Sequence, residues 1–229
     1  KDQPVLGKKG DNIRIDWGYA YLAVPDAASS VVTGNPDQLK NDFKAKGQLT
    51  ATSSTVSGTA GELAMATVVN FGNVSGKTTS KHLLLGYDDV YSVQYFGQNL
   101  RGWWRRDPAT TMLKTLQTAE TDYQRLLTKS TAFDKKMYDD AVKAGGKSYA
   151  DLCQLAYRQA ISAHKIVAGP KGEVFFLSKE NFSNGSIGTV DVTYPSAPMF
   201  LLYNNELAKG LLRFIFDYSE SGRWKKDFP

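Results

Sequence analysis

The sequence predicts an α+β fold in which a β-rich N-terminal half precedes a helical C-terminal half. Apolar and polar residues alternate in several stretches of the first hundred residues, and apolar residues recur at helical spacing after residue 107. Hydrophobic residues make up 41% of the 229-residue chain and charged residues 22%, which suits a globular protein with a sizeable core. We therefore expect a β-rich region over residues 1–100, a linker over 101–107 and a helical domain over 108–229.

Strand patterns occupy four segments of the β-rich region: residues 13–24, 63–71, 81–85 and 90–96. The glycine-containing segment 72–76 is the turn between the second and third of them. A helix is expected over residues 36–46, because Asn35 can cap it and Pro36 suits its first turn. Residues 50–61 are rich in Thr, Ser and Gly, and are interpreted as a loop or a weak edge strand.

The helical domain begins at Asp107 and Pro108, which combine an N-cap with a proline in the first turn. Apolar residues follow at helical spacing as far as residue 127. The periodicity of this half predicts that Leu116, Leu155 and Ala160 are buried.

Further breaks are expected inside the helical domain. Ser130 is interpreted as the cap of a second helix that ends at residues 145–146, and Ser148 as the cap of a third. Residues 174–177 form a short apolar strand. A last helix is expected from residue 204 or 205 to 218, with an apolar stripe along one side.

Charge and hydropathy argue against two classes of partner. The net charge of +5 and the pI of about 9.1 are mild, and the lysines are scattered. Residues 101–106 interleave arginines with tryptophans, a pattern that can bind single-stranded nucleic acid but also suits a surface corner with packed indoles. No apolar run approaches the roughly 18–20 residues of a membrane span. We expect neither a nucleic-acid nor a membrane partner.

Several patterns match functional motifs only in part. Cys153 is the only cysteine, and the two histidines, His82 and His164, are far apart, so we expect no metal and no cofactor. Residues 72–78 have three residues between their glycines, where a phosphate-binding loop needs four. Asp88 and Asp89 are neighbours whose side chains point to opposite faces of a strand, and are interpreted as part of a solvated turn.

The segment with the densest chemistry is residues 178–196. Its carboxylates, Glu180 and Asp191, are the candidate catalytic residues, and its other polar groups suit a small polar substrate. The candidate substrate-binding residues are Asn181, Ser183, Asn184 and Tyr194. Pro195 and Pro198 bar helix before them, so we interpret the segment as a long loop. A scaffold loop held by its own hydrogen bonds is the alternative.

Four segments resemble the glutaminase A family, which comprises secreted or periplasmic bacterial and fungal proteins. They are residues 10–19, 87–97, 157–160 and 178–196, and they keep the family's order along nearly the full chain. The longest match has two parts: Ser-Lys-Glu-Asn-Phe-Ser-Asn-Gly and, three residues further on, Thr-Val-Asp-Val-Thr-Tyr-Pro-Ser. The resemblance implies a periplasmic or extracellular bacterial protein. Any targeting segment is expected to have been removed or never included.

The resemblance implies a sandwich-like β region followed by part of an (α/α)6 toroid. Six hairpins need six helix pairs, and residues 107–229 offer four or five helices. We therefore expect a fragment that contacts a missing C-terminal part of the same polypeptide. Leu211, Phe214 and Ile215 are candidates for the exposed apolar surface of that contact, unless the last helix packs inward.

The function implied by the resemblance is hydrolysis of L-glutamine to L-glutamate and ammonia. From the residues, Glu180 or Asp191 is the general acid or base, and Asn181 and Asn184 stabilise the oxyanion. A glycoside hydrolase or carbohydrate-binding protein is the first alternative, because two carboxylates and four tryptophans suit a sugar ring. A non-catalytic interaction module is the second. A fixed cation for an α-carboxylate would favour glutamine.

Overall fold

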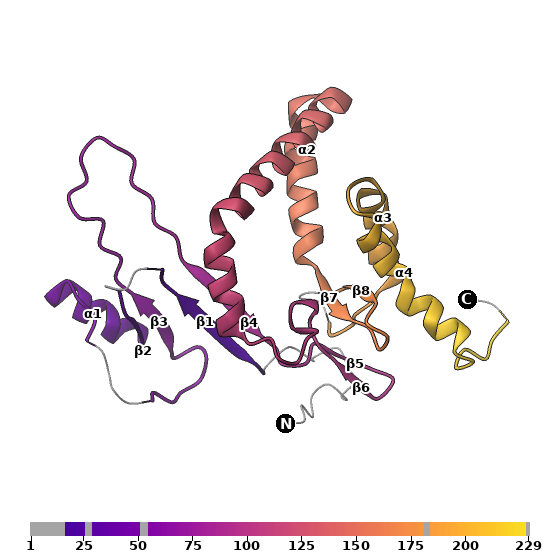
Figure 1. Cartoon of the computed structure of the whole chain (residues 1–229), viewed down its shortest axis with the longest axis horizontal. Helices are drawn as coiled ribbons and strands as arrows, with labels where there is room; N and C mark the ends of the chain where they lie inside the picture. The colour runs from indigo at the N-terminus through magenta and orange to yellow at the C-terminus, as the bar shows by residue number, and fades with distance from the viewer. Residues whose placement is uncertain (1–16, 26–28, 51–54, 181–183, 228–229) are drawn as a thin grey trace. The chain divides into compact units, whose positions relative to one another are not determined.

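The computed structural model describes residues 17–25, 29–50, 55–180 and 184–227 (Figure 1). Small antiparallel sheets precede and flank helices that dominate from Met112 onward, so the predicted α+β fold class is confirmed. The described strands form four two-stranded sheets. The chain divides into two compact units. The first unit contains Tyr19–Asp88 and Met112–Thr121, and the second contains the other described residues.

The first unit holds two sheets and one helix. Strand β1 (Tyr19–Ala23) pairs with β4 (Leu84–Asp88), and β2 (Val31–Gly34) pairs with β3 (Ala64–Thr67). Helix α1 covers Pro36–Lys46, as the sequence predicts. Asn35 Oδ1 accepts the backbone N–H groups of Asp37 and Gln38, which satisfies two donors that a helix start leaves unpaired.

Several strand predictions differ from the structure in their bounds. The expected strand over 81–85 is displaced to β4, and that over 63–71 shrinks to β3. Strand β2 lies where no strand was expected, because its four residues are too short for alternation to be recognised. Residues 13–16 of the first expected strand lie outside the described residues.

The second unit centres on the hairpin of β7 (His164–Ala168) and β8 (Val174–Ser178). A smaller hairpin joins β5 (Val93–Tyr95) to β6 (Gln98–Leu100), and the 3-10 helix η2 covers Trp103–Arg105. The helices are α3 (Val190–Tyr203), α4 (Asn205–Glu220) and most of α2 (Met112–Ser162).

Helix α2 covers the region where three helices were expected between residues 108 and 163, and it consists of two helical segments joined at a break. It runs through Ser130 without a break, so the predicted cap there is wrong: the helical apolar pattern continues past this exposed serine. The helix is interrupted at Gly146, whose φ of 81° and ψ of −178° are not helical. Figure 1 shows that α2 folds back on itself. A glycine tolerates a positive φ because it has no Cβ. The predicted helix end at residues 145–146 is therefore confirmed as a break between two helical segments.

Helix α3 is the clearest departure from the sequence prediction, because it includes Pro195 and Pro198. Prolines disfavour a helix interior by removing an N–H donor and by crowding the preceding turn. Tertiary packing overrides that local cost: Phe200 is fully buried against Phe176 of β8, with ring centroids 4.9 Å apart. The long loop expected over residues 178–196 therefore ends at Thr189.

Two apolar clusters cover opposite faces of the β7–β8 hairpin, because side chains alternate along a strand. Val167, Phe175 and Leu177 pack with Leu100 on one face. The buried residues of the other face are Phe176, Phe200, Ala208 and Leu211. A hairpin buried on both faces is a rigid base for the segment that follows β8.

Burial in the helices agrees only in part with the periodicity. Leu116 and Ala160 are half-buried, whereas Leu155 is 52% exposed, so the prediction for Leu155 is wrong. Leu211 is buried rather than available to a partner, because α4 turns this side chain onto β8. Other apolar residues of the second unit are exposed, and they include Leu126, Leu127, Leu152, Leu201, Leu202 and Phe216.

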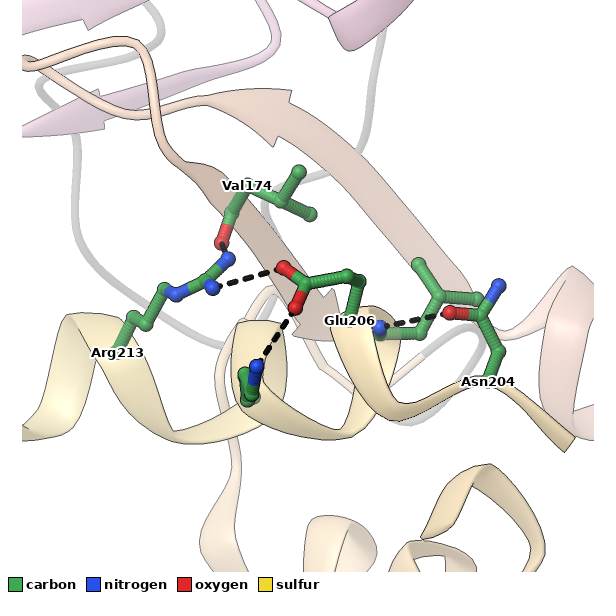
Figure 2. Close-up of polar contacts among 6 residues, drawn as sticks. Val174, Asn204, Glu206 and Arg213 are labelled. Atoms are coloured by element: carbon green, nitrogen blue, oxygen red, sulfur yellow. Dashed lines mark hydrogen bonds and ion pairs between the residues drawn. The ribbon is translucent and has the colours of Figure 1, made fainter. Parts of the chain in front are cut away.

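A cluster of charged side chains on helix α4 connects this helix to β8 through a hydrogen bond (Figure 2). Arg213 donates from Nη2 to Glu206, at 2.9 Å, and from Nη1 to the carbonyl of Val174, at 3.4 Å. Glu206 also accepts from Lys209 at 2.7 Å. Hydrogen bonds from Lys209 and then Arg213 lower the pKa of the Glu206 carboxyl. Gly210 completes the contact, since a Cβ there would come within 3.0 Å of Phe176 Cβ.

Candidate functional site

The segment after β8 forms a loop with a hydrogen-bonded base. Lys179 and Ile187 form an isolated antiparallel bridge. Glu180 N–H donates to the Ser186 carbonyl at 3.2 Å, and Gly188 N–H donates to the Ser178 carbonyl at 2.7 Å. These bonds close a loop that begins with the half-buried Glu180. The structure thus places one predicted catalytic carboxylate, Glu180, at the hydrogen-bonded base of a loop.

The predicted substrate-binding residues of this loop are only partly described. Asn184 is half-buried, and its Oδ1 accepts the Ser186 N–H at 2.7 Å, so part of its polarity holds the loop. Asn181 and Ser183 lie outside the described residues.

Asp191 and Tyr194 lie on α3 instead of on a loop. They are three residues apart in the first turns of the helix, so they are neighbours on its surface. Both are exposed, and Tyr194 is 82% exposed. Asp191 also lies where the positive end of the helix dipole favours a carboxylate, a role that needs no substrate.

Two hydroxyl groups tie the loop to α3 through the carbonyl of Thr189. Ser178 is fully buried, and its Oγ donates to the Thr189 carbonyl at 3.0 Å. Thr193 Oγ1 donates to the same carbonyl at 3.1 Å and lies 3.3 Å from Ser178 Oγ. Sequence reasoning did not select these residues, although two hydroxyls beside apolar neighbours are a recognisable signal. They fix where the loop ends.

A hollow of about 660 Å³ opens between the end of α2, the start of β7 and α3. Two segments that are far apart in the sequence, 157–160 and 178–196, both contribute to its lining. The lining includes apolar Leu155, Ala160, Ala163 and Val192 and polar Arg158, Gln159, Ser162, His164 and Ser196. The exposed Arg158 gives the hollow a positive charge. A small polar molecule with an anionic group suits such a site.

His164 is part of the wall rather than an accessible base. Its Nδ1 lies 2.6 Å from the carbonyl oxygen of Ala160, so the Nδ1–H group donates there. The ring stacks on Phe176, with centroids 4.5 Å apart. Burial lowers the pKa of the His164 imidazole, and the hydrogen bond to Ala160 opposes this shift. Nε2 is buried and has no partner within the part of the chain that the structure describes.

Asp88 and Asp89 do not form the solvated turn that their sequence suggests. Both are buried, and Asp89 is only 1% exposed. Asp89 forms an ion pair with Lys165 of β7, a residue 76 positions away, which local reasoning cannot find. Val90 follows with a φ of 61°, a left-handed conformation that is strained for a β-branched residue.

Among the described residues, no three His, Cys, Asp or Glu side chains gather into a group able to hold a metal ion. None of the described helices is both long enough and apolar enough to span a membrane.

Comparison with known proteins adds family information. Residues 146–229 match the glutaminase A six helical-hairpin domain, and residues 1–140 match a domain of unknown function, DUF5127. Glutaminase A of Aspergillus oryzae (strain ATCC 42149 / RIB 40) is 31% identical over 119 residues, which are 52% of this chain and 17% of that protein. A probable glutaminase of Arthroderma benhamiae (strain ATCC MYA-4681 / CBS 112371) is 28% identical over 121 residues, 53% of this chain and 14% of that protein. No solved structure matches the chain.

Proposed function

The chain belongs to the glutaminase A family, and from this we propose that it is part of an amide hydrolase that converts L-glutamine to L-glutamate and ammonia. The observation that carries the proposal is the hollow beside α3, although neither Glu180 nor Asp191 is among its lining residues. It gathers two of the segments that resemble the family, and it holds Arg158 in its lining. The matched regions span about one-sixth of the relatives' length, so the reaction belongs to a longer protein.

Hydrolysis of an amide needs an activated water or nucleophile, a stabiliser for the oxyanion and a proton donor for the departing ammonia. Glu180 or Asp191 supplies the general base and acid in this proposal. Asn181 and Asn184 stabilise the oxyanion. Tyr194 or Ser183 donates a hydrogen bond to the substrate.

Arg158 would bind the α-carboxylate of glutamine. Within the part of the chain that the structure describes, its guanidinium forms no hydrogen bond or ion pair, so its donors are available. A guanidinium binds a carboxylate through two parallel hydrogen bonds. Arg158 thus provides the cation that distinguishes an amino-acid site from a site for a neutral sugar.

A glycoside hydrolase or carbohydrate-binding protein is the second candidate. Two carboxylates, Glu180 and Asp191, lie on the same 178–196 segment, and carboxylate pairs carry glycosidase chemistry. The position of Arg158 favours glutamine over this reading, because a neutral sugar gives the cation no charged partner. A non-catalytic interaction module would need neither carboxylate.

The deciding experiment measures ammonia release from L-glutamine by the purified full-length protein, alongside a panel of chromogenic glycosides. We expect ammonia release, and we expect Arg158→Gln to raise KM for glutamine at least about tenfold, the scale of one charged hydrogen bond. Arg125→Gln is the matched control, because Arg125 is an exposed arginine that pairs with Asp122 within α2. Hydrolysis of a glycoside without ammonia release would reverse the order of the two candidates.

Partner and compartment are further parts of the proposal. We propose that other helices of the same polypeptide cover the exposed apolar residues of α2 and α3. A groove of about 600 Å³ between these helices supports it, with Tyr149, Tyr157 and Tyr203 among its lining residues. Leu202 is 74% exposed beside the groove, so Leu202→Glu should lower the Tm of the full-length protein by several degrees if it is covered there.

Val74→Glu is the control for this test, since Val74 is 70% exposed in the first unit. Equal effects of the two substitutions would argue against a covering helix. A periplasmic or extracellular location remains a proposal based on the family, and fractionation of the native cells tests it.

A further inference from the structure

Lys179 and Lys165 share one face of the β7–β8 hairpin. Lys165 lies opposite Leu177 in the ladder, and the Lys179 N–H donates to the Ala163 carbonyl at 2.9 Å, which extends the ladder past Ser178. Side chains two residues apart on a strand point to the same face. Lys165, Leu177 and Lys179 therefore lie on one face, and Glu180 lies on the other.

The Asp89 carboxylate already forms an ion pair with Lys165. It is almost fully buried. The backbone around it is fixed as well, because the Trp17 indole N–H donates to the carbonyls of Asp89, at 2.9 Å, and Tyr91, at 3.2 Å. Asp89 thus lacks the freedom to turn toward Lys179.

The group formed by Asp89, Lys165 and Lys179 has one positive charge in excess. The Lys179 ammonium forms no hydrogen bond or ion pair with any other residue whose position the structure describes, although the residue is half-buried. Burial and then the neighbouring Lys165 lower the pKa of the Lys179 amine, while Asp89 acts in the opposite direction. A partly desolvated cation without its own counter-ion is unfavourable, and a bound anion would relieve it.

We propose that Lys179 anchors a binding site for a small monocarboxylate, with the Asp89–Lys165 ion pair as its fixed wall. The net charge of Asp89, Lys165 and Lys179 determines which ligand fits best. A single carboxylate balances their one excess positive charge, whereas a dianion would leave an excess negative charge. The ammonium supplies up to three donors, and a charge-assisted hydrogen bond to a carboxylate is among the stronger ones. The site is separate from the proposed reaction at Glu180, which lies on the opposite face.

The test compares sodium acetate with sodium chloride at matched ionic strength, so that general screening cancels. The Tm of the full-length wild type is measured against Lys179→Met, which keeps the length of the side chain and removes its charge. Lys179→Arg keeps the charge. Lys143→Met is the matched control, since the Lys143 side chain is 79% exposed and lies 4.0 Å from Asp140.

We expect acetate at about ten times its Kd to raise the Tm of the wild type by about 3 °C more than chloride does. Lys179→Arg and Lys143→Met should keep this increment, and Lys179→Met should lose it. Without acetate, Lys179→Met should be at least as stable as the wild type. A second measurement needs no variant: acetate should slow modification of Lys179 by an amine-directed reagent at least about threefold, as followed by peptide mass spectrometry.

Two results would overturn the proposal. One is an equal acetate increment in the wild type and in Lys179→Met. The other is a destabilised Lys179→Met together with no acetate effect on the wild type, which would mean that a carboxylate of the protein itself already pairs with Lys179.

Discussion

Asp89→Asn is expected to lower the free energy of unfolding by about 3 kcal/mol, the scale of breaking a buried ion pair by removing one partner. Asp89 is almost fully buried, and the substitution leaves Lys165 and Lys179 facing each other without an anion. The Lys165 side chain is 25% exposed, so it can turn partly toward water. That freedom keeps the expected loss near the lower end of the range for buried pairs.

Lys165→Met should lower the free energy of unfolding by a comparable amount, because it leaves the buried Asp89 carboxylate with only Lys179 nearby. The double variant Asp89→Asn, Lys165→Met should lose less than the sum of the two single losses, since neither charge is then stranded. Denaturant unfolding of all four proteins measures this coupling.

The exposed pair Lys135–Asp139 supplies the control for the cycle. Asp139→Asn should change stability by less than about 0.5 kcal/mol, as is usual for a solvated helix pair. If Asp89→Asn costs no more stability than Asp139→Asn, the buried pair does not contribute measurably to the stability of the fold.

Asp89 was predicted to lie in a solvated turn but is buried, because local sequence patterns do not reveal contacts with distant residues. Two adjacent carboxylates between strands usually indicate a wet turn, and only the distant Lys165 makes burial of Asp89 tolerable. The fold class and helix α1 were predictable because their signals are local: alternation, helical spacing and the Asn35 cap. Domain bounds at residues 100 and 108 stay a prediction.

Helix α3 is a second case in which tertiary contacts override the local sequence pattern. Pro195 and Pro198 argue locally for a loop, but burial of Phe200 against β8 stabilises a helix through both. The consequence for the site is direct. Asp191 and Tyr194 lie on helix α3, whereas Glu180 lies at the base of the preceding loop. The six predicted site residues therefore do not all lie on one loop. The hollow with Arg158 could not be found from spacing, because α2 and α3 form it together.

Glu180→Gln is expected to lower the turnover of L-glutamine by the full-length protein at least about a hundredfold, the scale of losing one general acid–base group. Glutamine keeps the size and hydrogen-bonding capacity of the side chain but cannot exchange a proton near neutral pH. The backbone of residue 180 would still donate to the Ser186 carbonyl, so the loop should keep its shape. The Tm of the variant should therefore stay within about 2 °C of the wild type.

Controls separate catalysis by Glu180 from scaffolding. Glu220→Gln, at the exposed end of α4, should leave turnover unchanged. Asp88 is unsuitable as a silent control because it is buried, so its replacement tests folding instead.

Asp191→Asn tests the role of the second carboxylate. A loss of turnover as large as that of Glu180→Gln would assign the second acid–base role to Asp191. Normal turnover would mean that Asp191 serves only as the negative charge at the N-terminus of α3. Near-normal turnover in Glu180→Gln, or a loss that follows unfolding, would make the loop a scaffold and remove Glu180 from the reaction.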